Sequence, residues 1–335
     1  MTETLPATMR ALELRDHDGL PGSLTLVERP LPKPSQTEVL VKIIAANINP
    51  SDLMFLRGVY GTRRPLPTVP GFEGVGVVVS AGGPLGRLLV GRRVATSTQQ
   101  SDGTWAEYML ASALGCVPLR DRISDDQGAS FLINPFSAFG LFDTARRDGH
   151  KAAIHTAAAS ALGRMLVHIS RRERFPMVHV VRRAAQVELL RGLGAEHVLD
   201  SSEADFQSKL HALAAQLNAT AAFDAVAGPM SGILLHAMPR NSEVYVYGAL
   251  SEAHAQFDPR DLIFEGKKVR GWWLAEYLRR PDRAVLAMAS VPGYFDEGMA
   301  SPVRARYPFS KVHEALAAYQ GDMTAGKVLL VPDPR

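Results

Sequence analysis

A run of small residues stands where a strand should give way to a helix, between His155 and Gly163. Residues 152–155 read as a short apolar strand, and a helical run follows Gly163. Small side chains at such a turn let backbone N–H groups and the helix N-terminus approach a pyrophosphate. Ala158, Ser160 and Gly163 stand where the GxGxxG pattern has its glycines, and only the last of them is glycine. Taken alone, the match is equally compatible with an ordinary strand-to-helix turn.

Two adjacent arginines, Arg182 and Arg183, follow the next apolar run, residues 178–181, which reads as a second strand. In a dinucleotide fold an acidic residue near this point selects NAD by binding the ribose 2′-hydroxyl. Two guanidiniums are suited instead to a 2′-phosphate, because they are permanently charged and form bidentate hydrogen bonds. The pair therefore predicts NADPH as the cofactor, although two arginines in a solvated loop remain the alternative.

The elements around this turn alternate in type between residues 152 and 247. Strands are expected at 152–155, 178–181, 197–199, 222–226 and 242–247, with helices at 163–172 and 184–193. Strands that alternate with helices form a parallel, doubly wound sheet. The first part of the chain reads as short β-rich runs, and the last part as a helix near 311–319 and a strand at 327–331. We therefore expect an α/β protein in which a nucleotide-binding domain, residues 129–279, is inserted into a β-rich domain of residues 1–128 and 280–335.

Composition points to a globular protein outside membranes. The chain has 335 residues, too many for one ordinary core, and a formal net charge of only +3, which argues against a nucleic-acid partner. No apolar stretch reaches the ~20 residues of a membrane span, and residues 1–10 lack the apolar core of a signal peptide. The single cysteine, Cys116, cannot form an internal disulfide and fits a reducing compartment. We expect a cytoplasmic protein.

No metal site is expected. Zinc sites need clustered thiolate, imidazole or carboxylate ligands, whereas this sequence has one Cys and ten scattered His. No His/Glu pair has the spacing of metal ligands. Without zinc as a Lewis acid for alcohol oxidation, the most accessible chemistry is hydride addition to an electron-poor carbon, in an activated C=C bond or a quinone.

Several segments, in order along nearly the whole chain, resemble the zinc-free branch of the medium-chain dehydrogenase/reductase superfamily. This branch covers quinone oxidoreductases and trans-2-enoyl thioester reductases. The segments are ANINPSDL (46–53), GVYG (58–61) with VPGFEGVG (69–76), GTWAEY (103–108), NPFSA (134–138), YGAL (247–250), LIF (262–264) and RGWWL (270–274). The last three, and the length of the 157–163 turn, resemble enoyl-thioester reductases in particular. The resemblance implies a GroES-like β-rich catalytic domain and a Rossmann domain.

Two departures from the family pattern bear on the chemistry. Ala161 replaces a glycine that the family usually has between Ser160 and Leu162, and its methyl would weaken cofactor binding if it pointed toward the phosphates. Phe72 stands where the zinc branch has a histidine ligand. Because the chain has a single cysteine, it also lacks the thiolates of both zinc sites of that branch.

The resemblance implies roles for individual residues. Tyr60, in a loop flanked by glycines, matches a tyrosine thought to orient or protonate the substrate of enoyl reductases; a packing tyrosine is the alternative. Asn49 matches an asparagine on the nicotinamide side, where it could hold the carboxamide or a substrate oxygen. Together with the turn, the resemblance assigns cofactor contacts to Ser137, Ala158, Ser160, Ala161, Leu162, Gly163, Arg182, Arg183, Tyr247, Gly248, Trp272, Trp273 and Lys327.

Several of these assignments have alternatives. Ser137 could instead be the N-cap of a helix, and Lys327 could be a surface residue. Trp272 and Trp273, with Phe264, could line a hydrophobic substrate channel, or could pack in the core or a dimer interface. The strand around residues 269–274 is the expected dimer edge of a homodimer.

The sequence thus predicts an NADPH-dependent, zinc-independent reductase acting on a small molecule with an activated C=C bond, such as an enoyl thioester or an enone. An NADPH:quinone oxidoreductase is compatible with the same residues. A non-catalytic NADPH-binding protein, a sensor or a crystallin-like protein, is the third alternative, because fold alone does not determine function. The basic pair Arg63 and Arg64 could meet an acidic carrier or a phosphopantetheine, or could lie in a solvated loop.

Overall fold

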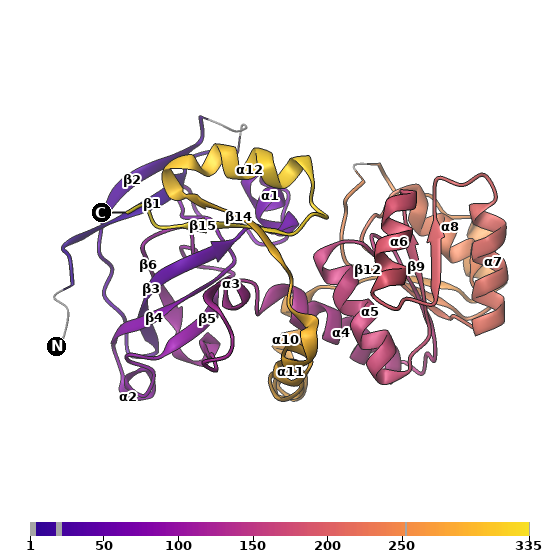
Figure 1. Ribbon diagram of the computed structural model, residues 1–335, viewed down its shortest axis with the longest axis horizontal. Helices are drawn as coiled ribbons and strands as arrows, with labels where there is room; N and C mark the ends of the chain where they lie inside the picture. The colour runs from indigo at the N-terminus through magenta and orange to yellow at the C-terminus, as the bar shows by residue number, and fades with distance from the viewer. Residues whose placement is uncertain (1–4, 18–21, 252, 335) are drawn as a thin grey trace. The chain divides into compact units, whose positions relative to one another are not determined.

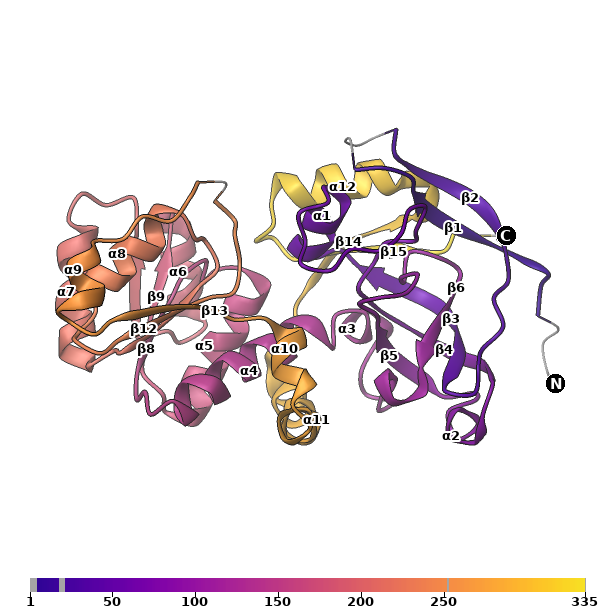
Figure 2. The same ribbon diagram turned by 180° about the vertical axis from the view of Figure 1, so that it is seen from behind.

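The structure, a computed structural model, describes residues 5–17, 22–251 and 253–334. They form two compact units: unit 1 consists of the residues up to Ile133 and from Ser301 onward, and unit 2 of Asn134–Ala300. Unit 1 is β-rich, and unit 2 contains a sheet flanked by helices (Figure 1, Figure 2). The predicted α/β fold class is confirmed.

Unit 1 is built mainly from strands. Its strands are β1 (Thr8–Leu14), β2 (Leu24–Pro30), β3 (Glu38–Asn47), β4 (Glu73–Ala81), β5 (Arg93–Ser97), β6 (Tyr108–Ser112), β7 (Val117–Pro118), β14 (Val303–Pro308) and β15 (Lys327–Val331). Seven of them form one sheet in the order β14-β15-β3-β4-β5-β7, with β6 paired to β3, and β1 pairs with β2. Its helical segments are α1 (Pro50–Leu56), α2 (Pro84–Arg87), η1 (Ala113–Gly115), α3 (Asp125–Gly128), η3 (Phe309–Lys311) and α12 (Val312–Gly321).

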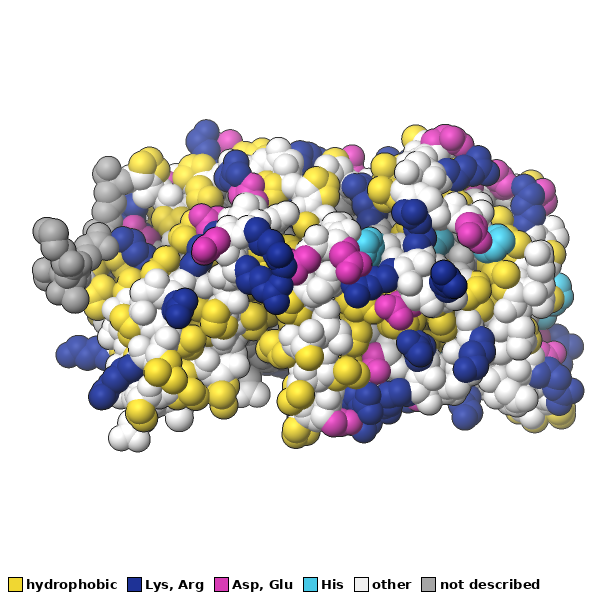
Figure 3. All heavy atoms as spheres, turned by 60° about the horizontal axis from the view of Figure 1, so that its bottom comes forward, with side chains coloured by type: hydrophobic (Ala, Val, Ile, Leu, Met, Phe, Trp, Pro, Cys, Tyr) yellow, Lys and Arg dark blue, Asp and Glu magenta, His cyan; other side chains and the backbone are white. Residues whose placement is uncertain are grey.

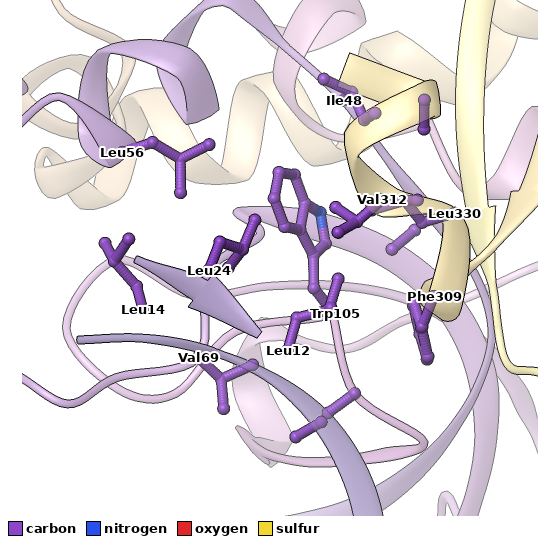
Figure 4. Close-up of a cluster of buried hydrophobic side chains, with 14 of the residues drawn as sticks. Leu12, Leu14, Leu24, Ile48, Leu56, Val69, Trp105, Phe309, Val312 and Leu330 are labelled. Carbon is purple, nitrogen blue, oxygen red and sulfur yellow. The ribbon is translucent and has the colours of Figure 1, made fainter. Parts of the chain in front are cut away.

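The core of unit 1 surrounds Trp105, which is fully buried. Leu12 from β1 packs in this cluster with Val312 from α12 and Leu330 from β15 (Figure 4). The indole Nε1 of Trp105 donates a hydrogen bond to the carbonyl oxygen of Asn47, at the end of β3, over 3.3 Å. The last segment of the chain therefore completes a core that the first segment begins, which explains why the C-terminus returns to unit 1.

Unit 2 contains a six-stranded sheet. Its strands are β8 (Ala153–His155), β9 (Met177–Val181), β10 (His197–Asp200), β11 (Ala221–Asp224), β12 (Glu243–Val246) and β13 (Lys268–Gly271). They are all parallel and lie in the order β10-β9-β8-β11-β12-β13. Its helical segments are α4 (Ile133–Arg147), α5 (Ala161–Glu173), α6 (Ala184–Gly192), α7 (Phe206–Leu217), α8 (Pro229–Ala237), α9 (Pro259–Ile263), α10 (Leu274–Arg279), α11 (Pro281–Tyr294) and the π-helical turn η2 (Phe295–Met299).

Helices cover both faces of this sheet, as the alternation of side chains along β9 shows. Val178 and Val180 pack in one cluster with Leu210 of α7. Val181 points to the opposite face and packs in another cluster with Val167 of α5. The strand order reverses between β8 and β11, and in doubly wound sheets ligands bind outside the carboxyl ends of the strands at such a point.

Unit 2 differs from the domain limits expected from the sequence at both ends, because it begins at Asn134 and not at residue 129 and ends at Ala300 and not at residue 279. The sequence placed residue 280 onward in the β-rich domain, whereas α11 and η2 lie in unit 2. The hydroxyl of Tyr294 donates to Glu173 Oε1 of α5 at 2.6 Å, and its ring lies 5.8 Å from that of Phe139 of α4. These contacts hold the segment against helices of unit 2.

The surface carries mixed charge. On the face shown in Figure 3, Lys and Arg side chains are interspersed with Asp and Glu, so the described residues form no continuous basic patch on this face. None of the described helices combines the length and the apolar character required to cross a membrane.

Candidate active site

The turn after β8 presents the N-terminus of α5. Ser160 is the N-cap of this helix, and its Oγ accepts a hydrogen bond from the Gly163 N–H at 3.1 Å. Ala161 and Leu162 are the first two helical residues, whose N–H groups have no partner within a helix. A Cβ on Gly163 would lie 2.3 Å from the Ala158 carbonyl oxygen, so only glycine fits. The turn thus combines the backbone donors and the positive helix end that bind phosphate groups.

Ala158 is tied to the sheet. Its N–H donates to the carbonyl oxygen of Val180 at 3.1 Å, and its fully buried methyl packs in the cluster with Val167 and Leu190. Ala157, just before it, has a positive φ of 51°. The structure therefore gives Ala158 a part in shaping the turn, and its contact with a cofactor stays a prediction.

Arg182 and Arg183 lie at the carboxyl end of β9, between that strand and α6, and both are exposed. Within the described part of the chain, neither side chain has an acidic partner. The backbone N–H of Arg182 donates to Gln186 Oε1 at 3.2 Å, and Arg183 is the N-cap of α6. Both guanidiniums are therefore available to an anion next to the turn of α5.

A cavity of about 550 Å³ opens at the carboxyl ends of the strands of unit 2, where the turn into α5 also lies. Its residues follow β10 or lie on the helices that begin after β10 and β11. They are Ser201, Glu203, Ala204, Phe206, Gln207, Ser208, Met230 and Ile233. None of these residues was predicted from the sequence. The sequence signal that could have identified them is their position shortly after β10 and β11.

Tyr247 and Gly248 lie directly after β12. The hydroxyl of Tyr247 and Nε2 of His155 are 2.9 Å apart. Burial raises the pKa of Tyr247 and the charge of Asp224 raises it further, so the phenol stays protonated. Burial, reinforced by His179, holds the pKa of His155 well below its usual value, so this imidazole is neutral. A Cβ on Gly248 would lie 2.7 Å from the carbonyl oxygen of Ala225, so glycine lets these two strand ends approach closely.

Three other predicted residues of unit 2 have surroundings that the sequence did not reveal. Ser137 is buried inside α4, which begins at Ile133, so the N-cap alternative is wrong. Trp272 and Trp273 follow β13, which ends at Gly271, so they are not part of the strand expected at 269–274. The indole of Trp272 donates to Thr144 Oγ1 of α4 at 3.1 Å. Trp272 therefore packs within unit 2, and its contact with a cofactor stays a prediction.

Asn49 and Lys327 meet in a buried polar cluster of unit 1. Lys327 Nζ donates to Asn49 Oδ1 at 2.6 Å, and Asn49 Nδ2 donates to Glu73 Oε1 at 2.9 Å. The backbone N–H of Asn49 donates to Asp52 Oδ2 at 2.8 Å. Asn47 Nδ2 also reaches Glu73 Oε1, at 3.0 Å. The sequence did not reveal a role for Glu73, Asp52 or Asn47, although all three lie in the segments 46–53 and 69–76.

These contacts fix the orientation of the Asn49 amide. Its oxygen accepts from the ammonium, and one of its N–H bonds is used by Glu73. Lys327 is only 2% exposed, which excludes the surface-residue alternative. The structure places Lys327 against Asn49; its contact with a cofactor and that of Asn49 with a carboxamide or substrate oxygen stay predictions.

Burial shifts the pKa of two groups in this cluster. The pKa of Asp52 rises to about 7, chiefly through desolvation, and the charge of Glu73 adds to the rise. The N–H groups of Asn49 and Phe72 oppose it by donating to the carboxylate. Desolvation lowers the pKa of Lys327 to about 8, against the attraction of Glu73 and Asp52. The carboxyl group of Asp52 and the ammonium group of Lys327 therefore both titrate near neutral pH.

Tyr60 lies beside Phe72, with ring centroids 4.8 Å apart, and is half-buried. Phe72 is buried, and the guanidinium of Arg64 lies 5.1 Å from its ring centroid. Arg64 is 6% exposed and donates to the carbonyl oxygen of Val69 at 2.9 Å, so it is not in the solvated loop considered from the sequence. Since the Phe72 N–H donates to Asp52 at 3.0 Å, Tyr60 adjoins the same cluster.

Comparisons with known proteins agree with this architecture. Residues 35–121 match the family model of the alcohol dehydrogenase GroES-like domain, and residues 161–290 that of zinc-binding dehydrogenases. A solved structure of a candidate NADPH:quinone reductase from Mesorhizobium loti is 34% identical, with a TM-score of 0.90 over 98% of this chain and 100% of that one. This chain belongs to the medium-chain dehydrogenase/reductase superfamily.

Two further relatives within the superfamily match nearly the whole chain. Human mitochondrial enoyl-[acyl-carrier-protein] reductase is 26% identical over 333 residues, 97% of this chain and 89% of the relative. A mycobacterial relative solved in complex with NADPH is 25% identical, with a TM-score of 0.82 over 97% of this chain and 100% of that one. The predicted membership of the superfamily is confirmed, and relatives of this chain are oxidoreductases.

The match to zinc-binding dehydrogenases does not extend to a metal site in the described structure. No group of three or more His, Cys, Asp or Glu among the described residues is arranged to hold a metal ion. Cys116 is buried, and burial raises the pKa of its thiol to about 11, far from the thiolate that a metal requires.

The raised pKa of Asp52 predicts a pH-dependent contribution to stability. The folded protein holds a proton on Asp52 that the unfolded chain releases between about pH 4 and pH 7, so this carboxyl group destabilises the fold increasingly as pH rises. We expect Asp52→Asn to gain stability relative to the wild type between pH 5 and pH 8, by up to about 1.4 kcal/mol for each pH unit between pH 5 and pH 7. Urea unfolding at both pH values measures the difference.

Asp102→Asn is the matched control. Asp102 also accepts a backbone N–H, from Val69 at 2.8 Å, but its side chain is 43% exposed. Because Asp102 is not enclosed in the fold as Asp52 is, we expect this variant to have the same effect on stability at pH 5 and at pH 8. Parallel stability curves for the wild type and Asp52→Asn would contradict the prediction.

Proposed function

We propose that the chain is an NADPH-dependent reductase that adds hydride to the activated C=C bond of a 2-enoyl thioester or an enone-type substrate, without zinc. The turn after β8, with two unpaired guanidiniums after the neighbouring strand, carries the proposal. The similarity to enoyl-[acyl-carrier-protein] reductases, over 97% of the chain for the human protein, supports the substrate class. The similarity to a mycobacterial protein that holds NADPH supports the cofactor.

The residues of unit 2 fit NADPH. The N–H groups of Ala161 and Leu162 would bind the pyrophosphate, because the first turn of a helix leaves them free. Arg182 and Arg183 would bind the 2′-phosphate, which distinguishes NADPH from NADH. The cavity after β10 is at the strand ends where a doubly wound fold holds its nucleotide, so we assign the adenosine half to it.

The residues of unit 1 provide the polar chemistry. NADPH, when bound, supplies the hydride. Tyr60 would hold a proton at its hydroxyl for the oxyanion or carbanion that hydride addition creates, since a phenol stays protonated at neutral pH. The amide of Asn49, fixed between Glu73 and Lys327, would orient a carboxamide or a substrate oxygen.

A quinone is the second candidate substrate. The 34% identical relative from Mesorhizobium loti is a candidate NADPH:quinone reductase, and so is a relative from Bacillus thuringiensis at 26% identity. Reduction of a quinone needs the same hydride donor and a proton donor of the same kind.

The deciding experiment is NADPH oxidation, followed at 340 nm, with crotonyl-CoA and 1,4-benzoquinone as separate acceptors and NADH as the control cofactor. Turnover of crotonyl-CoA at several per second, a kcat in the ordinary range of enzymes, supports the proposal. Turnover with benzoquinone alone transfers the assignment to the quinone reductases. Tight NADPH binding with no turnover on either acceptor indicates the non-catalytic alternative.

Replacing Arg182 and Arg183 together by Ala tests the cofactor assignment. We expect the KM for NADPH to rise more than about tenfold, because two charge-assisted contacts to the 2′-phosphate are lost, while the KM for NADH stays nearly unchanged. Arg191→Ala, which removes an exposed arginine of α6 paired with Glu188, is the control. Equal effects of the double variant on both cofactors would refute the assignment.

Tyr60→Phe tests the proton donor. We expect kcat/KM for crotonyl-CoA to fall by about 10- to 100-fold, because general acid catalysis contributes at least that much in comparable sites. Tyr307→Phe is the matched control, since Tyr307 packs against the same core cluster as Tyr60. A loss of less than about threefold in Tyr60→Phe would remove this residue from catalysis.

We also propose a homodimer joined through β13. All four residues of this edge strand are exposed, and Ile263 and Phe264 nearby are 69% and 66% exposed. An open strand edge with apolar neighbours favours pairing with a second copy. Sedimentation should give twice the chain mass of 36.3 kDa, and Val269→Lys on the edge should shift the protein toward monomer. A wild-type protein that sediments as a monomer at micromolar concentration excludes this dimer.

A cytoplasmic location remains our inference from Cys116. A single buried thiol needs no oxidising compartment. The human relative is mitochondrial by name, so fractionation of the native host cell decides between the two compartments.

A further inference from the structure

Asp224, the last residue of β11, is fully buried and receives four hydrogen bonds at its carboxylate. Oδ1 accepts from the hydroxyl of Thr156 at 2.8 Å and from the N–H groups of Val226 at 2.9 Å and Ala227 at 3.2 Å. Oδ2 accepts from the hydroxyl of Ser231 at 2.6 Å. Thr156 and Ser231 are also fully buried. The charge is therefore surrounded by donors from two turns and a helix, as a buried carboxylate requires.

Further bonds extend this network to three neighbouring strand ends. The hydroxyl of Thr156, directly after β8, accepts from the N–H of Ala225 at 2.9 Å. The backbone carbonyl of Asp224 accepts from the N–H groups of Tyr247 at 2.9 Å and Gly248 at 3.4 Å, after β12. The carboxyl ends of β8, β11 and β12 are thus joined at one residue.

The turns that this network joins contain unfavourable backbone conformations. Ala157, next to Thr156, has a φ of 51°, and Ala227, whose N–H donates to Asp224, has a φ of 59°. Residues with a Cβ rarely adopt positive φ, and they keep it only where the surrounding structure imposes it. The hydrogen bond from the Ala227 N–H to Asp224 constrains one turn directly, and the two hydrogen bonds of the Thr156 hydroxyl fix the residue that precedes Ala157.

We propose that Thr156, Asp224 and Ser231 are positioning residues for NADPH: they hold the turn of residues 157–163 in the conformation that opens the N-terminus of α5 to the pyrophosphate. Being fully buried, they act through the turn and not by touching the cofactor. The inference rests on the proposed function, because it presupposes that this turn binds NADPH. It adds residues that neither the glycine pattern nor the arginine pair identifies.

A network that only stabilises the fold would behave differently from one that positions the turn. Ser242 offers the comparison within the same unit. The hydroxyl of Ser242 is also fully buried and donates to the carbonyl oxygen of Pro239 at 2.6 Å. Ser242 precedes β12, however, so it lies at the amino ends of the strands, away from the turn after β8. Loss of its hydroxyl should lower stability without changing the turn after β8.

The experiment compares Thr156→Val, Thr156→Ser and Ser242→Ala in the full chain. Calorimetric titration measures the Kd for NADPH. Steady-state kinetics with an acceptor that the wild type reduces give kcat and the KM for NADPH, and circular dichroism gives Tm. We expect Thr156→Val to raise Kd and KM for NADPH by about tenfold, since it removes two hydrogen bonds, with kcat at saturating NADPH within about threefold. Thr156→Ser keeps the hydroxyl and should stay within about twofold of the wild type. Ser242→Ala should lower Tm while leaving Kd within about twofold.

The outcomes separate the inference from the proposed function. A wild type that does not bind NADPH overturns the function and with it the inference. A wild type that binds NADPH together with an unchanged Kd in Thr156→Val overturns the inference alone. An equal loss of affinity in Ser242→Ala also overturns it, because any loss of stability would then have the same effect.

Ser231→Ala keeps the test decisive if Thr156→Val does not fold. This variant removes the donor to Oδ2 and leaves the bond between Thr156 and Oδ1 intact. The inference is supported if this variant has the circular dichroism spectrum of the wild type and its Kd for NADPH is raised about threefold or more. An unchanged Kd contradicts it.

Discussion

A carboxylate cannot be taken out of water unless hydrogen-bond donors replace the water, and each unit of this protein has a buried carboxyl group that accepts four hydrogen bonds. In unit 1, Glu73 accepts from the amides of Asn47 and Asn49 and from the N–H groups of Leu132 and Ile133, at 2.9 to 3.1 Å. In unit 2, Asp224 plays the same part. Because each missing donor would be costly, the segments that carry the donors have little freedom to move apart. The two carboxylates therefore fix where strand ends, helix starts and turns meet.

This constraint has direct consequences for the candidate site. Glu73 and Lys327 hold the amide of Asn49 from opposite sides, so its orientation is set before any ligand arrives. Asp224 does the same for the turn that leads into α5. Sites that are rigid in advance lose less entropy on binding and hold reacting groups closer to the productive geometry. The strained residue Ala157 indicates that the fold gives up some stability to obtain this arrangement.

The similarity to both enoyl reductases and quinone reductases follows from the chemistry that these enzymes share. Under the proposed function, either reaction would transfer hydride from NADPH to an electron-poor carbon and would gain from a proton donor beside the negative charge that develops. In the proposed roles, the nucleotide turn, the arginine pair and Tyr60 would serve either reaction equally well. Substrate choice therefore depends on the side chains that surround the acceptor and not on the fold.

Local features were determined by the sequence itself. The alternation of strands and helices, the need for glycine at position 163 and the location of Arg182 and Arg183 follow from periodicity, residue size and short spacing, which act within a few residues of one another. The network partners could not be predicted in this way. Thr156 and Asp224 are 68 residues apart, and Asn49 and Lys327 are 278 apart, so their hydrogen bonds exist only after the strands have paired. The tertiary structure likewise decided that Ser137 lies inside a helix, that Trp272 packs on α4 and that Arg64 is buried, because burial depends on what distant segments bring to each side chain.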